Sequence, residues 1–135
     1  MYYTESYRYA IFAYDFNPEK GTISNRRIFI EIDPNTGGMP DGLTVDADGY
    51  IWSAECGSGK VIRYSPKGKV DYSITLPVPR VTSCTFGGED YSTLYITTAR
   101  EHMSQDQLSK WPLSGSLFAC KPGVSGIPET PFKEK

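Results

Sequence analysis

The residues best suited to chemistry lie in segment 38–52, where aspartates flank a short apolar strand. Pro40 fixes φ for a turn and Gly42 relieves the steric limit behind it, so Asp41 is expected at the entrance of that strand. A carboxylate fixed in this way is the best candidate for chemistry in the chain. Pro-Asp-Gly is also ordinary turn sequence, so a purely structural aspartate is the alternative interpretation.

The other residues with chemically reactive side chains are expected to have structural roles. Asp46 and Asp48 follow Asp41 closely, but no Asp-x-Asp-x-Asp-Gly loop with a distal Glu is present, so both are expected to shape a turn. His102 is the only histidine and precedes a polar stretch, which indicates a solvent-facing loop. Cys84 has no basic or histidine neighbour that would lower its pKa, so it is expected as a small buried hydrophobic residue.

The composition limits both the size of the fold and its partners. With 135 residues the chain is long enough for one domain with a core and too short for two ordinary ones. Lys and Arg number 14 against 16 Asp and Glu, which gives a net charge of -2. Because no basic field is present to hold phosphate backbones or anionic lipids, neither nucleic acid nor a membrane surface is expected as a partner.

Cysteine usage and hydrophobicity indicate a reducing, cytoplasmic setting. Cys56, Cys84 and Cys120 are odd in number, widely spaced and without a Cys-x-x-Cys pair, which argues against a disulfide framework and a thiolate zinc site. No apolar run approaches the roughly 18 residues of a membrane span. The N-terminus also lacks a basic region followed by an apolar one, so no targeting signal is expected.

Apolar residues alternate in short runs separated by Gly, Pro, Asn and Asp, which predicts an all-β chain built from hairpins. The one helical pattern, residues 104–110, is expected as a short surface insertion between strands. The predicted strands are residues 1–4, 10–14, 27–32, 43–46, 50–54, 61–64, 70–75, 83–86, 94–98 and 116–120.

An internal repeat relates residues 2–21, 51–68 and 94–123. Each copy holds two apolar strands followed by a Pro and a Gly. The copies recur at roughly 43 to 56 residues with about four strands per unit, which is typical of propeller blades. An apolar strand precedes the second and third copies at 42–45 and 82–86, and would line the central channel.

The first copy has no such innermost strand, so the chain is expected to open inside a blade. Trp52 and Tyr95 occupy matching repeat positions, which favours packing over ligand stacking. Trp111 lies in the insertion and either caps the channel or anchors the loop. One partial propeller domain is predicted, divided into an incomplete blade and two further blades at residues 1–37, 38–80 and 81–135.

Four segments carry a specific resemblance to a known family: residues 23–27, 38–52, 82–88 and 97–100. They resemble the regucalcin family, also called senescence marker protein 30, gluconolactonase and luciferin-regenerating enzyme. The resemblance covers nearly the whole chain but corresponds only to the C-terminal half of a family member. It implies about half, roughly three blades, of a six-bladed β-propeller.

The resemblance also implies one divalent metal ion, Ca²⁺, Zn²⁺, Mg²⁺ or Mn²⁺, at one end of the channel. The family ligands are a glutamate, an asparagine of an Asn-Gly turn and an aspartate of a Pro-Asp-Gly turn, and only the last matches a position here, Asp41. The implied reaction is hydrolysis of a sugar lactone, in which the metal polarises the carbonyl and Asp41 accepts a proton from water. Glu5 stands where the family tends to carry an acidic residue; a surface contact is its expected role, and a place at the channel rim is the alternative.

Two functions follow as hypotheses. In the first, the chain is the C-terminal part of a metal-dependent sugar lactonase and is inactive by itself, because only one site residue is present. In the second, it is a non-enzymatic metal-binding or interaction half-propeller. Three blades leave two apolar end faces open, so two copies are expected to pair as a homodimer that completes the ring.

Overall fold

The computed structural model describes residues 1–131, so the last four residues of the predicted blade 81–135 lie outside the described part. The chain forms three antiparallel sheets, and the all-β prediction is confirmed. The first sheet has the order β1-β2-β3, the second β4-β5-β6-β7 and the third β10-β9-β8. The strands are β1 (Tyr2–Glu5), β2 (Ala10–Asn17), β3 (Thr22–Glu31), β4 (Met39–Val45), β5 (Ile51–Cys56), β6 (Lys60–Tyr64), β7 (Val70–Thr75), β8 (Val81–Gly87), β9 (Thr93–Thr98) and β10 (Phe118–Cys120).

All ten predicted strands are present, and most differences concern their ends. The largest is β3, predicted at 27–32, which begins five residues earlier at Thr22. Its first part pairs with β2 in an exposed hairpin, where side chains face water and the apolar alternation that marks a strand is weak. Gly21, with φ 63°, makes the turn that starts this hairpin.

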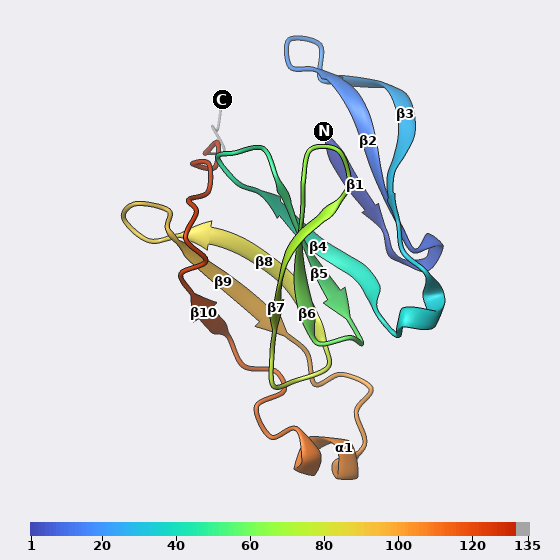
Figure 1. Cartoon of the computed structure of the whole chain (residues 1–135), viewed down its shortest axis with the longest axis vertical. Helices are drawn as coiled ribbons and strands as arrows, with labels where there is room; N and C mark the ends of the chain where they lie inside the picture. Colours follow the sequence, from blue (N-terminus) through green and yellow to red (C-terminus); the bar gives the residue numbers. More distant parts are fainter. Residues whose placement is uncertain (132–135) are drawn as a thin grey trace.

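The three sheets follow one another in space as they do in the chain (Figure 1). The second sheet lies in the middle: β4 and β5 pack on β8 of the third sheet, and β1 of the first sheet packs near β4. Within the described residues the first sheet has three strands and the second has four. The arrangement is that of blades stacked face to face around an axis.

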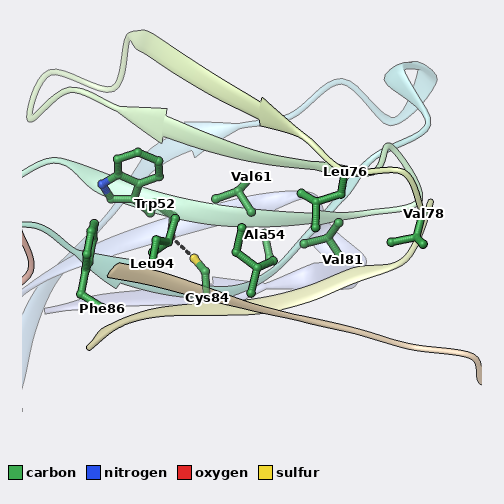
Figure 2. Close-up of a cluster of buried hydrophobic side chains, with 10 residues drawn as sticks. Trp52, Ala54, Val61, Leu76, Val78, Val81, Cys84, Phe86 and Leu94 are labelled. Atoms are coloured by element: carbon green, nitrogen blue, oxygen red, sulfur yellow. Dashed lines mark hydrogen bonds between the residues drawn. The ribbon is translucent and has the colours of Figure 1, made fainter. Parts of the chain in front are cut away.

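The main core lies between the second and third sheets. Trp52 is fully buried there, with its ring edge-on to Phe86 at a centroid distance of 5.7 Å. Figure 2 shows these side chains, and the Cys84 thiol among them donates to the Trp52 carbonyl at 3.5 Å. The packing role predicted for Trp52 and Cys84 is confirmed, and burial raises the pKa of Cys84 to about 12. The cluster comprises Trp52, Ala54, Val61, Leu76, Val78, Val81, Cys84, Phe86, Leu94 and Ile96.

A smaller cluster joins the first and second sheets. It is built on Ile11, Ile30 and Tyr64. Successive side chains of a strand point to opposite faces, so in β5 Trp52 faces the third sheet, while Glu55 faces the first. Strand β5 is therefore buried on both faces, which fixes its register.

Asp46 holds the turn between β4 and β5 together. It is fully buried, and its Oδ1 accepts hydrogen bonds from the backbone N–H groups of Asp48 and Tyr50 at 3.0 and 2.9 Å. Its Oδ2 accepts from Trp52 Nε1 at 2.9 Å and from Arg63 Nε at 2.8 Å. The Arg63 guanidinium lies 3.7 Å from the Tyr50 ring centroid and also pairs with Asp48 at 3.2 Å. The turn role predicted for both aspartates is confirmed.

The predicted helical insertion is present as α1 (Gln105–Lys110) between β9 and β10. Ser104 caps it, because its hydroxyl accepts from the Gln107 N–H at 3.2 Å while the Gln107 side chain accepts from the Ser104 N–H at 2.9 Å. His102 precedes the helix on an exposed loop, as predicted. Trp111 follows it half-buried beside Lys110, and a role in covering the channel stays a prediction.

Two further expectations concern the surface and the thiols. Glu5 forms ion pairs with Arg8 at 3.0 Å and Arg26 at 3.1 Å, which is the surface contact predicted for it. Cys56 and Cys120 are free thiols, as is Cys84. No helix among residues 1–131 is long and apolar enough to cross a membrane.

Candidate functional site

The structure places Asp41 inside a strand and corrects the prediction of a tight turn. The predicted strand began at Leu43, but β4 already includes Pro40, Asp41 and Gly42. Pro40 pairs with Glu55, and the register shifts before Leu43, so the strand bulges at Asp41 and Gly42. A β-bulge breaks the regular ladder and re-aims a side chain, and it tolerates a proline that lacks an N–H donor. Asp41 still lies in the first residues of an innermost strand.

Gly42 is required by packing between sheets and not by turn geometry. Its φ is not among the positive values, so a side chain is not excluded by the backbone angle. A Cβ at this position would instead stand 2.5 Å from the Cβ and 2.8 Å from the Cα of Ser83 in β8. The backbones of β4 and β8 therefore approach closely here, and this contact holds Asp41 beside the third sheet.

The same irregularity recurs in the next innermost strand. In β8 the register shifts between Val81 and Ser83, which places the bulge at Thr82. Thr82 Oγ1 lies 2.8 Å from Thr97 Oγ1, so its hydroxyl is satisfied within the sheet. Bulges at the start of β4 and β8 indicate that the repeat uses this position to turn a side chain out of the ladder. Only β4 carries a carboxylate there.

Asp41 is half-buried, and this environment changes its acidity. Burial raises the pKa of Asp41, and the hydrogen bond from the Gly42 backbone N–H opposes that shift. The pKa of the nearby Cys56 thiol is raised, mainly by burial. The charge of Arg80 lowers this pKa, and the charge of Asp41 raises it. A carboxylate, a guanidinium and a neutral thiol thus share one end of the second sheet.

Arg80 is the member of this group that the sequence did not reveal. Its backbone bridges to Cys56, and the Pro79 carbonyl accepts from the Gly57 N–H at 2.9 Å, so the residue is fixed beside β5. Its Nε is buried, and no described residue accepts a hydrogen bond from it. Cys56 and Arg80 both line a cavity of about 280 Å³ at this end of the sheet. No motif marks Arg80, because its position depends on the pairing of residues far apart in the chain.

A divalent metal needs several oxygen or nitrogen ligands, and this requirement can be tested on the described residues. Among residues 1–131 no group of three or more His, Cys, Asp and Glu side chains could hold a metal ion. Asp41 offers one carboxylate, and the positive charge of Arg80 lies at the same end of the second sheet, where it would repel a cation. The residues described here do not fit a complete metal site.

Comparison with known proteins identifies the family. The model of the SMP-30/Gluconolactonase/LRE-like region matches residues 1–100 of the chain. The chain belongs to this family. Its similarity to curated members extends further: it is 41% identical over 130 residues to regucalcin of Oryctolagus cuniculus, covering 95% of this chain and 43% of that protein. It is also 40% identical over 131 residues to 6-deoxy-6-sulfogluconolactonase of Pseudomonas putida, covering 97% of this chain and 45% of that protein.

A solved family structure confirms the arrangement of the sheets. The calcium-binding protein regucalcin of Agrobacterium tumefaciens superposes with a TM-score of 0.92 at 28% identity, covering 98% of this chain and 45% of that chain. The three sheets therefore correspond to a little under half of a regucalcin propeller, as the resemblance implied. This SMP-30/gluconolactonase chain spans less than half the length of the curated relatives it matches.

Proposed function

We propose that the chain is the C-terminal part of a divalent-metal-dependent sugar lactone hydrolase and that Asp41 is its contribution to the site. The observation that carries the proposal is the bulge at Asp41, which sets one half-buried carboxylate at the start of an innermost strand. Membership of the SMP-30/gluconolactonase family supports the activity, and the sulfogluconolactonase relative supports a sugar lactone as substrate. Each sheet would form one blade, over 1–37, 38–80 and 81–135.

The chemistry of Asp41 follows from its surroundings. Lactone hydrolysis adds water to the carbonyl carbon and breaks the ring C–O bond, and a carboxylate beside the water accepts its proton. Burial raises the pKa of Asp41, which makes the ionised group a stronger base than an exposed aspartate. A metal ion, Ca²⁺, Zn²⁺, Mg²⁺ or Mn²⁺, would polarise the carbonyl, but its other ligands are not supplied by the described residues.

A chimera tests this proposal. The chain would replace the matching part of rabbit regucalcin, and hydrolysis of D-glucono-1,5-lactone would be followed by acid release. We expect an active chimera whose activity falls roughly a hundredfold or more in Asp41→Asn, because general-base catalysis contributes about that factor. Asp48→Asn is the matched control, since that carboxylate is 63% exposed on the same sheet. A folded chimera whose lactonase activity is unchanged by Asp41→Asn would contradict the proposal.

The chain by itself is expected to hydrolyse little or no lactone, because one carboxylate is not a complete site. Purified chain would be assayed with each of the four metals. Metal-dependent hydrolysis that disappears in Asp41→Asn would overturn this expectation and assign a complete site to the chain.

A second candidate function is a half-propeller that pairs with another copy, and the outer face of the first sheet favours it. Tyr3, Phe12 and Ile28 are cross-strand partners on β1, β2 and β3, so they form one apolar row. Tyr3 and Ile28 are 52% and 58% exposed, while Phe12 between them is 6% exposed and has the Arg26 guanidinium 3.9 Å from its ring centroid. Neighbouring Ile11 packs toward the second sheet, so the row faces the other way. Exposed apolar patches of this kind mark interaction surfaces.

Light scattering after size exclusion tests the pairing. We expect a dimer of the chain, and Tyr3→Lys together with Ile28→Lys should shift it to monomer without loss of β-structure. A monodisperse wild-type monomer at high concentration would exclude this candidate. The free thiols support a reducing, cytoplasmic setting for either function.

A further inference from the structure

A cavity lies between the first and second sheets, apart from Asp41 and Arg80. Its volume is about 450 Å³, within the range of small-ligand sites. Apolar side chains from both sides form much of its wall: Phe29 of β3 and Ile32 just after it, and Ile62 and Val70 of the second sheet. Every wall belongs to this chain, so the cavity does not depend on further blades.

Glu55 supplies a buried carboxyl group to this cavity. The residue is only 1% exposed, and it lines the cavity from the end of β5. Ser53 Oγ donates to its Oε1 at 3.2 Å and the Tyr64 hydroxyl donates to the same oxygen at 3.5 Å. No described residue donates a hydrogen bond to Oε2, and no ion pair to Glu55 is present among residues 1–131. Glu55 therefore has neutral hydrogen-bond donors on one oxygen and no cationic partner among the described residues, whereas buried charges are ordinarily paired.

The charges around the cavity favour a cation. Glu31 and Asp33 line it from the first sheet and the following turn, and Glu55 lines it from β5. Lys60 is the one cationic side chain among the lining residues. Lys60 pairs with Glu55 across the β5–β6 hairpin but is exposed and makes no ion pair with it. Three carboxyl groups against one ammonium give the cavity a net negative character when all are ionised.

We propose that this cavity binds a small organic cation, a primary ammonium group on a short alkyl chain. The ammonium would donate hydrogen bonds to Glu55 Oε2, and the alkyl chain would contact the apolar walls at Ile32, Ile62 and Val70. The proposal is independent of the lactonase function, because Asp41 and Arg80 are not among the lining residues.

Calorimetric titration of the intact chain with n-pentylammonium chloride near pH 8 tests the proposal. n-Pentanol and sodium pentanoate have the same alkyl chain with a neutral and an anionic head. We expect n-pentylammonium to bind at least roughly tenfold more tightly than n-pentanol, since a charge-assisted hydrogen bond contributes more than a neutral one. Pentanoate should not bind. Equal affinity for the three compounds would overturn the proposal without any variant being needed.

Variants locate the site. Glu55→Gln keeps the size of the side chain and should weaken n-pentylammonium binding roughly tenfold or more, by the same charge-assisted contribution. Glu19→Gln, an exposed change on the β2–β3 hairpin, is the control and should bind as wild type. Lys60→Met removes the competing cation and should tighten binding. Undiminished binding in folded Glu55→Gln, or binding that appears only in Lys60→Met, would refute the proposal for the natural chain.

Discussion

Replacing Asp46 should cost this chain a large part of its stability, although the residue lies outside the proposed site. Asp46→Ala removes one acceptor from four donors: two backbone N–H groups, the Trp52 indole and the Arg63 guanidinium. None of these donors has water as a ready substitute, because Asp46 is fully buried and the Arg63 side chain is only 11% exposed.

The magnitude follows from those contacts. Removing one partner of a buried ion pair costs about 3 to 5 kcal/mol, because the other charge remains desolvated. Arg63 keeps Asp71 at 2.7 Å and Asp48 at 3.2 Å, which retains part of its stabilisation. We therefore expect a loss of about 3 kcal/mol for Asp46→Ala, against a total stability of about 5 to 15 kcal/mol for a domain.

Urea unfolding followed by tryptophan fluorescence measures this loss. Asp48→Ala is the control: it removes a carboxylate from the same guanidinium, but one that is 63% exposed, so we expect less than about 1 kcal/mol. Arg63→Met in the Asp46→Ala background should recover part of the lost stability, because it removes the buried guanidinium that has lost its Asp46 partner. A cost below about 1 kcal/mol for Asp46→Ala would refute the reasoning.

Three further outcomes are expected. Burial raises the pKa of Glu55 from 4.5 to about 7, so the free energy of unfolding should be about 3 kcal/mol higher below pH 4.5 than above pH 7. Urea midpoints should therefore fall as the pH rises through this range, and Glu55→Gln should flatten that dependence. Gly42→Ala should destabilise by about 1 to 3 kcal/mol through overlap with Ser83, and Ser83→Gly should recover part of it; an unchanged urea midpoint would contradict the close approach. Asp41→Asn should raise the thermal midpoint at pH 8, because a half-buried charge is removed, and a lower midpoint would show that the carboxylate stabilises the fold.

Local sequence was sufficient where a pattern depends on neighbours in the chain. The alternation of apolar and polar residues predicted every strand, and β7 was predicted with its exact bounds, 70–75, because Gly68 and a proline-containing segment frame it. The capped helix after Ser104 was predicted for the same reason, since a cap needs only residues three apart. The exposed start of β3 was missed, because water-facing residues carry no alternation.

Contacts between distant segments could not be predicted in this way. The sequence suggested that Gly42 completes a turn, whereas Ser83, forty-one residues later, is the reason for the glycine. Glu55 ends an apolar strand pattern and nothing in the sequence marks it, yet in the structure it is a buried carboxyl group that lines a cavity with residues of β3 and β6. Arg80 likewise reaches Cys56 only through the packing of the second and third sheets.

The sequence by itself determined the all-β class, the repeat and the family, and it singled out Asp41 as a candidate, because these follow from residue types and their spacing along the chain. Only the tertiary structure decided how Asp41 is held, by a bulge in β4 against β8, and which other charged groups are desolvated. Burial and close approach are set by the packing of whole sheets, and that packing depends on all their side chains together.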